Sequence, residues 1–220
     1  MPRADDDATI AIRVRCADVP ASLPEPIQAR WLERLPKPQR RALAARLARG
    51  TGLPSLTVLA LLAGLVDTLP LPLERLQWTA CGKPRIPQGP QFSLTHSRGF
   101  AACAVNTDDS PIGIDLEPAG RVRSAAVALV ADAAERRALA EGRMTPTGLW
   151  TVKEAVLKAA GAGLPEIRGV TVRDDVASFA GIDYRWRHIG PGSGLLLAVA
   201  TRDTLPHVGL DWLSWPAVFV

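Results

Sequence analysis

The chain contains few cysteines, and their arrangement argues against the sites that cysteines usually build. There are three of them, Cys16, Cys81 and Cys103, in 220 residues. The number is odd, the three lie far apart, no CxxC pair occurs, and the chain has only three histidines. These features disfavour a disulfide framework and a structural zinc site. We therefore expect a reduced, cytoplasmic setting.

Signals for nucleic-acid binding, export and membrane insertion are also missing. Lys and Arg number 26 against 22 Asp and Glu, a mild excess that fits an acidic partner, but no basic run is interleaved with aromatics. Three aspartates, at 5–7, stand where a signal peptide would be basic and then apolar. The longest apolar run, Leu56–Val66, is too short to span a bilayer. The sequence predicts a soluble protein with no nucleic-acid or membrane partner.

What the chain does contain is a large apolar fraction, 47% of the residues, arranged in recognisable periods. Ile10–Arg15 alternates as a half-buried strand does, whereas Leu56–Val66 is typical of a buried helix. Between them, Gln39–Arg49 predicts a basic helix with a solvated face. Leu76–Ile86 contains the sequence Gly-Lys-Pro, which predicts a turn that presents Lys83.

A hairpin is predicted next, from Phe92–His96 and Phe100–Val105, with a turn at Arg98 and Gly99. The hairpin places His96 near its tip. A single histidine in such a position is more often structural or merely exposed than part of a site.

Ile112–Pro118 predicts a strand whose period of two places Asp115 and Glu117 on the same face. Two adjacent carboxylates repel each other unless water screens them or a cation joins them. The pattern alone leaves open an exposed strand edge and a site for a hard divalent cation.

Trp150–Leu164 predicts a helix that the glycines after Ala160 terminate. Glu154 and Lys158 stand one turn apart on one face of this helix. An exposed pair of this kind contributes only about 0.2–0.5 kcal/mol. Because Lys153 is the only other charge, we expect the helix to be buried, and a buried carboxylate requires a partner or a metal.

The second half of the chain repeats the coarse order of the first, a helix followed by strands. A helix is expected at Ala125–Ala140, with Asp132, Glu135, Arg136 and Arg137 on its solvated side. Strands are expected at Gly169–Arg173, Ile182–Arg187 and Leu195–Thr201. We therefore predict an α+β fold of two similar lobes, residues 1–110 and 111–220, in a pseudo-twofold arrangement with the active site in the cleft between them.

Four motifs together resemble the 4'-phosphopantetheinyl transferases of the Sfp type. They are GKP at Gly82–Pro84, FSLTHS at Phe92–Ser97, GIDLE at Gly113–Glu117 and WTVKEAVLKAAGAGL at Trp150–Leu164. The resemblance implies Mg²⁺-dependent transfer of the phosphopantetheine arm of coenzyme A to a serine of an apo acyl or peptidyl carrier protein. The second product would be adenosine 3',5'-bisphosphate.

The resemblance also implies roles for the acidic residues and the helix pair. Asp115, Glu117 and Glu154 would be ligands of Mg²⁺, or of Mn²⁺ in its place. Glu154 would act as the base for the carrier serine, directly or through water. Lys158 would steady the phosphate and the leaving group.

Contacts to coenzyme A follow from the same resemblance, with one departure from the family pattern. Lys83, Thr95 and His96 match positions that contact the nucleotide and the phosphates. The family arginine that precedes a Ser-Leu or Thr-Leu pair and contacts the 3'-phosphate is replaced here by Pro54. We expect a basic residue of the preceding helix to take over this contact, the candidates being Arg41, Arg46 and Arg49.

Two other functions use the same residues. A magnesium-dependent phosphohydrolase would use the carboxylates, the lysine and the histidine to activate water instead of a carrier serine. A non-catalytic relative would only bind a carrier or a nucleotide. Because each lobe supplies part of the transferase site, we expect a monomer to suffice.

Overall fold

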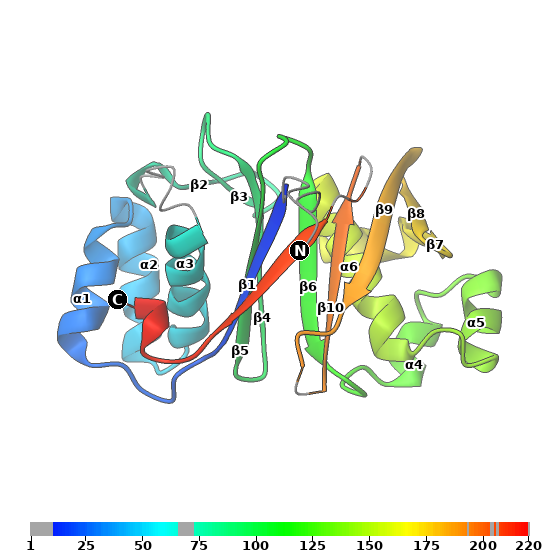
Figure 1. Cartoon of the computed structure of the whole chain (residues 1–220), viewed down its shortest axis with the longest axis horizontal. Helices are drawn as coiled ribbons and strands as arrows, with labels where there is room; N and C mark the ends of the chain where they lie inside the picture. The colour runs from blue at the N-terminus through cyan, green and yellow to red at the C-terminus, as the bar shows by residue number, and fades with distance from the viewer. Residues whose placement is uncertain (1–10, 66–72, 193, 203–204, 206, 220) are drawn as a thin grey trace, which may run out of the picture.

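The computed structural model describes residues 11–65, 73–192, 194–202, 205 and 207–219. These residues form a mixed α/β fold in which two sheets lie side by side between helices (Figure 1). Helices α1–α3 lie outside the first sheet, and α6 lies outside the second. The predicted α+β class is thus confirmed at the level of a mixed fold, while the pseudo-twofold relation between lobes stays a prediction.

The first sheet has the strand order β11-β1-β5-β4. Its apolar face packs against three helices, and the core between them is built mainly from leucines of α3. The strands are β1 (Ile12–Asp18), β4 (Gln91–Ser97), β5 (Phe100–Asn106) and β11 (Val208–Leu213), and the helices are α1 (Glu25–Glu33), α2 (Lys37–Ala48) and α3 (Leu53–Leu65).

Most sequence predictions for this lobe are confirmed, with shifted ends. The hairpin of β4 and β5 turns at Arg98 and Gly99 and places His96 next to the turn, as expected. Helix α3 is buried on nearly every side. Val66, its predicted end, and Ile10, the predicted start of the first strand, lie outside the described residues. The proline-containing helix α1 was not predicted.

The second sheet has the strand order β6-β10-β9-β8-β7 and packs against α6. Thr145 caps the start of α6 by accepting the Gly148 amide, and Gly161 ends it in the left-handed conformation at φ 71°. The elements are β6 (Ile112–Pro118), β7 (Thr171–Arg173), β8 (Val176–Phe179), β9 (Ile182–Ile189), β10 (Leu195–Thr201) and α6 (Pro146–Ala160).

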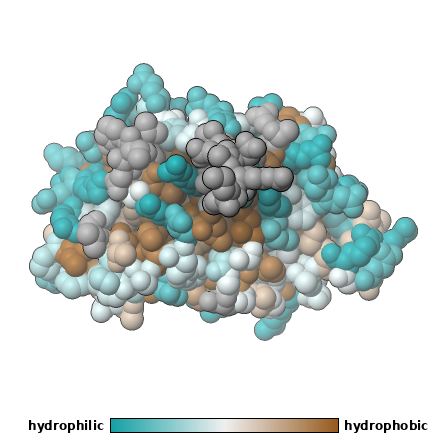
Figure 2. Space-filling view, viewed as in Figure 1, coloured by the Kyte–Doolittle hydropathy of each residue, from teal (hydrophilic) through white to brown (hydrophobic). Residues whose placement is uncertain are grey.

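The two sheets share an apolar layer contributed by β1 and β5 on one side and by β6 and β10 on the other. Ile112, Ile114 and Leu116 of β6 are all fully buried in it. In Figure 2, apolar residues gather on the visible face over the middle of the molecule, where these strands lie in Figure 1. The predicted face of β6 is therefore confirmed, and it joins the two lobes.

The long helix expected at Ala125–Ala140 is wrong, because the chain forms two short helices there. They are α4 (Ser124–Ala128) and α5 (Ala133–Ala140). Asp132 interrupts the helix since its side chain accepts the Glu135 amide at 2.9 Å, while Glu135 accepts the Asp132 amide at 2.8 Å. This reciprocal capping box starts a new helix at Ala133.

The capping box also explains why Glu135 is buried and not solvated as expected. Its carboxylate accepts a hydrogen bond from the Val172 amide at 2.8 Å and forms an ion pair with Lys153 at 2.9 Å. Lys153 Nζ donates in addition to the Val170 carbonyl. Both side chains are almost fully buried, so the pair ties α5, α6 and β7 together.

We predict that Asp132→Ala lowers the free energy of unfolding by about 1 kcal/mol, the usual cost of losing an N-cap. Burial raises the pKa of Asp132, but hydrogen bonds from the Glu135 amide and Arg173 lower it overall. The stabilisation is therefore complete above the ordinary pKa of Asp and disappears as pH falls through the lowered value. Urea unfolding between pH 2 and 7 should show this, and a loss that is the same at every pH would contradict it.

The end of the described chain returns to the first lobe. Strand β11 pairs with β1 in parallel. The short 3-10 helix η3 (Ala217–Phe219) follows, and its Phe219 ring packs edge-on against Trp31 of α1. The division expected between residues 110 and 111 stays a prediction, while β11 belongs to the first sheet because it pairs with the edge of β1.

Candidate functional site

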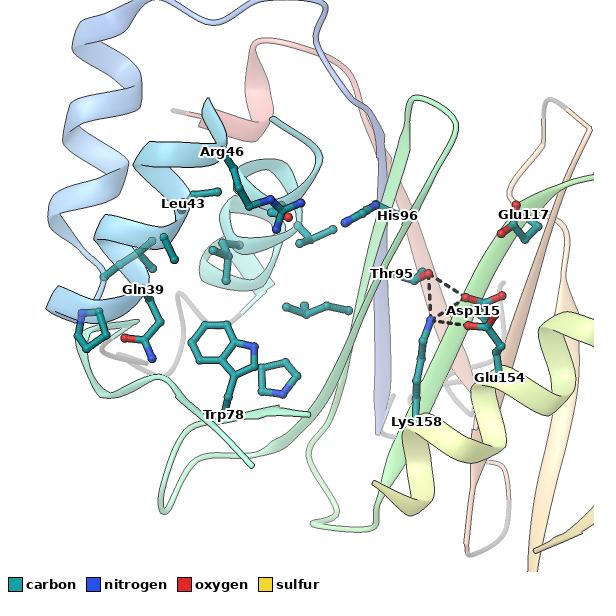
Figure 3. A pocket seen from close by; sticks show the side chains of 18 residues that line it. Gln39, Leu43, Arg46, Trp78, Thr95, His96, Asp115, Glu117, Glu154 and Lys158 are labelled. Carbon is teal, nitrogen blue, oxygen red and sulfur yellow. Dashed lines mark hydrogen bonds and ion pairs between the residues drawn. The ribbon is translucent and has the colours of Figure 1, made fainter. Parts of the chain in front are cut away.

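Helix α6 lies directly on strand β6, and Gly113 makes this possible. A Cβ atom at Gly113 would lie 1.9 Å from the Ala155 carbonyl oxygen and 2.4 Å from the Ala159 amide nitrogen. Only glycine permits so close an approach. The contact brings the face of α6 that carries Glu154 and Lys158 over Asp115 of β6 (Figure 3).

Asp115 and Lys158 form the centre of the site. Lys158 Nζ lies 2.6 Å from Asp115 Oδ1 and 3.8 Å from Glu154 Oε2. Thr95 of β4 donates to the same Asp115 oxygen at 3.0 Å and accepts from Lys158 at 3.2 Å. Asp115 is buried, so the exposed strand edge that the sequence left open is excluded.

The charges and burial in this group shift the pKa of the Glu154 carboxyl towards neutral pH. Burial and the neighbouring Asp115 carboxylate raise the pKa of Glu154 to about 7, although Lys158 opposes the shift. Burial lowers the pKa of Lys158, but Asp115 and Glu154 more than offset this and raise it overall. At neutral pH Lys158 is therefore charged, and Glu154 can exchange a proton.

Strand β4 is joined to β6 by a series of hydroxyl groups. Ser93 Oγ accepts the Ile114 amide at 3.0 Å, Thr95 binds Asp115, and Ser97 donates to Glu117 Oε2 at 2.5 Å. The three hydroxyls alternate along β4 and so share one face. They orient two carboxylates of the second lobe from the first.

These residues line a cavity of about 690 Å³. Its opposite wall comes from α2 and the short hairpin of β2 (Gln77–Trp78) and β3 (Pro84–Arg85). Figure 3 shows Arg46, His96, Gln39 and Trp78 on this side, across β4 from the carboxylates. Desolvation, together with the positive charges of Arg46 and Lys158, lowers the pKa of His96. The cavity thus has an acidic end and a basic end.

Comparison with known families identifies the acidic end. Residues 111–188 match the family model described as the 4'-phosphopantetheinyl transferase superfamily. Over these residues the chain is similar to that superfamily, and we call them the transferase domain. No curated protein matches the chain. The match includes both β6 and α6, so the transferase domain carries the carboxylates and Lys158, whereas the basic wall precedes it.

Most of the residues that the sequence assigned to the transferase site do meet around one cavity. Those that line it are Arg46, Thr95, His96, Asp115, Glu117, Glu154 and Lys158. Arg41 is exposed on α2 and does not line the cavity. Lys83 faces away from it, towards the end of α6, with its Nζ bound to two backbone carbonyls. The turn that bears Lys83 therefore does not present it to the transferase site.

The sequence reading missed several residues of the transferase cavity. Trp78 and Gln39 line its basic end, Trp78 being 42% exposed. Ser97 holds Glu117, and Trp150 hydrogen-bonds to Glu154. The alternation of hydroxyls in FSLTHS was a signal for Ser97, whereas a tryptophan before a turn gives no comparable indication.

Members of this superfamily use coenzyme A and a divalent metal, and the donor atoms here are compatible with such an ion. Asp115 Oδ2 is buried and has no hydrogen-bond partner among the residues that the structure describes, so its lone pairs are available to a cation. In the described part of the chain, no group of three or more His, Cys, Asp or Glu side chains forms a metal site on its own.

Proposed function

We propose that the protein transfers the 4'-phosphopantetheine group of coenzyme A to a serine of an apo acyl or peptidyl carrier protein, as an Sfp-type enzyme. The observation that carries this proposal is the cavity with two unlike ends. A buried carboxylate and a charged lysine face it from the transferase domain, and Arg46 and His96 face it from the first lobe. A ligand with separate phosphate groups, such as coenzyme A, matches this distribution of charge.

The chemistry would proceed by displacement at the β-phosphorus of coenzyme A. The serine oxygen forms a bond to phosphorus, and the bond from phosphorus to the bridging oxygen breaks. Adenosine 3',5'-bisphosphate then leaves. Glu154 accepts the serine proton, directly or through water, which its raised pKa allows near neutral pH. Lys158, fixed by Asp115 and Thr95, offsets the charge on the transferred phosphoryl group.

Asp115, Glu117 and Glu154 are the residues that would hold Mg²⁺ or Mn²⁺. When bound, such an ion neutralises the charge of the pyrophosphate. Thr95 and Ser97 orient two of these carboxylates from the first lobe. The metal ligands thus depend on both halves of one chain, which supports a monomer as the active unit.

Arg46 is our candidate for the contact that the family arginine would make with the 3'-phosphate. We predict that Arg46→Ala raises the KM for coenzyme A about 10-fold or more, since a charge-assisted hydrogen bond contributes roughly 1.5–3 kcal/mol. Dephospho-coenzyme A, which lacks the 3'-phosphate, should show little change. Arg41→Ala, on the same helix but outside the cavity, is the comparison. If Arg41→Ala raised the KM for coenzyme A more than Arg46→Ala does, the assignment of the 3'-phosphate contact to Arg46 would be wrong.

The direct test is to incubate the protein with coenzyme A, Mg²⁺ and a panel of apo carriers from fatty-acid, polyketide and peptide synthesis. Mass spectrometry of each carrier should show the addition of one phosphopantetheine group. A carrier whose acceptor serine is changed to alanine is the control. Cleavage of coenzyme A at an equal rate without any carrier would favour a phosphohydrolase instead. Binding of carriers with no chemistry would indicate a non-catalytic relative.

No helix within the described residues is long and apolar enough to cross a membrane. We propose that the enzyme works in the cytoplasm, where coenzyme A and carrier proteins are both present.

A further inference from the structure

The side chain of Lys83 links the first lobe to the transferase domain at a point outside the main cavity. Lys83 stands in the turn between β2 and β3, which Thr79 fixes by accepting the Lys83 amide at 3.1 Å. From there Lys83 Nζ donates to the Ile112 carbonyl at 3.3 Å and to the Ala159 carbonyl at 3.2 Å. One ammonium group therefore holds the start of β6 and the end of α6.

The carbonyl of Ala159 needs such a partner. Helix α6 ends at Ala160, so Ala159 O is among the last four carbonyls, which no intrahelical amide can reach. In a longer helix the Gly163 amide would pair with it, but that amide donates to Glu166 Oε1 at 3.2 Å. A cation at this end of a helix also interacts favourably with the helix dipole.

The two carbonyls flank the closest contact between β6 and α6. Ile112 precedes Gly113, whose α-carbon leaves no space for a side chain beneath Ala155 and Ala159. Ala159 in turn follows Lys158, the residue that pairs with Asp115 at 2.6 Å. A change in the spacing at Lys83 would therefore be passed directly to the Asp115–Lys158 pair.

We propose that Lys83 is a positioning residue: by joining β6 to the end of α6 it sets the distance between Asp115 and Lys158. The effect of Lys83 on the reaction rate presupposes the proposed transferase function. The positioning role replaces the expectation that Lys83 contacts coenzyme A.

The two roles differ in the kinetic constant that they affect. Lys83→Met removes the ammonium group but retains most of the side-chain volume. If Lys83 positions the site, this variant should lower kcat about 10-fold to 100-fold, because a catalytic group that is misplaced by about 1 Å can slow a reaction by that factor. The Kd for coenzyme A, measured by calorimetry with Mg²⁺ and no carrier, should change less than about 3-fold. Lys83→Arg, which can still donate to both carbonyls, should recover much of kcat.

Arg85→Met is the matched control, because Arg85 lies in the same hairpin and its side chain donates to Gln77 of that hairpin at 3.3 Å. It removes the same charge from the same element and should leave kcat unchanged. A rise of about 10-fold in Kd for Lys83→Met with normal kcat would overturn the proposal in favour of a ligand contact. Normal values for both constants would overturn it as well.

Amide hydrogen exchange tests the proposal without relying on catalysis. In Lys83→Met, the peptide that spans the end of α6 should exchange faster than in the wild type and in Arg85→Met. Unchanged exchange there would overturn the positioning role. If the wild type modifies no carrier but exchange still increases in Lys83→Met, the proposed function fails while the link through Lys83 stands.

Discussion

Glu154→Gln is expected to lower the transfer of phosphopantetheine about 10²–10³-fold and at the same time to leave the fold as stable as before or slightly more stable. Burial and the Asp115 carboxylate already raise the pKa of Glu154 to about 7. A neutral amide of the same shape removes this repulsion, but it cannot accept the serine proton. The loss of activity and the gain in stability thus come from the same substitution.

The measurement combines single-turnover transfer to an apo carrier with urea unfolding of the same samples. Arg143→Ala is the control, since it removes an exposed ion pair with Glu141 at 2.6 Å, and Arg143 does not line the cavity. Such pairs contribute only about 0–1 kcal/mol, and transfer should be normal. Transfer by Glu154→Gln at close to the parental rate would remove Glu154 from the chemistry.

The second large effect is expected at the pair of Lys158 and Asp115. Lys158→Ala should lower transfer about 10²–10³-fold, the usual cost of losing a preorganised contact in the transition state. It should also cost about 1–3 kcal/mol of unfolding free energy, because Asp115 is buried and would keep only Thr95 as a partner.

A double variant separates these two consequences. Adding Asp115→Asn to Lys158→Ala removes the unpaired charge, so stability should recover while transfer stays low. Asp115→Asn alone should also increase the concentration of Mg²⁺ needed for half-maximal activity, and Asp108→Asn, an exposed acid in the turn before β6, should not. Recovery of transfer in the double variant would mean that the pair holds the fold and takes no part in the reaction.

The sequence was informative where a period and a motif coincide. The alternation of Ile112–Pro118 predicted both faces of β6, and the apolar composition of Trp150–Leu164 predicted a buried helix. The resemblance to the transferases then implied that Asp115, Glu154 and Lys158 meet, and in the structure they line one cavity. Strands β8 and β11 were not predicted, since the first is short and neither shows clear alternation.

Charged residues were the main source of error. Glu135 was assigned to a solvated face because acids usually are, yet the capping box with Asp132 turns it inward to Lys153. Lys83 was assigned to coenzyme A by its match to a family position, and in the structure its ammonium group donates to two backbone carbonyls. In each case the partner lies far away in the sequence, so local periodicity could not reveal it.

The return of β11 to the first sheet affects how the protein is made. The parallel neighbour of β1 is synthesised after the whole transferase domain. While the chain grows, one edge of β1 stays unpaired, and such an edge can pair with other chains. The second sheet, whose strands all lie between Ile112 and Thr201, can form without waiting for that segment. The first sheet, although β1 precedes every strand of the second sheet in the chain, is thus completed after the second sheet.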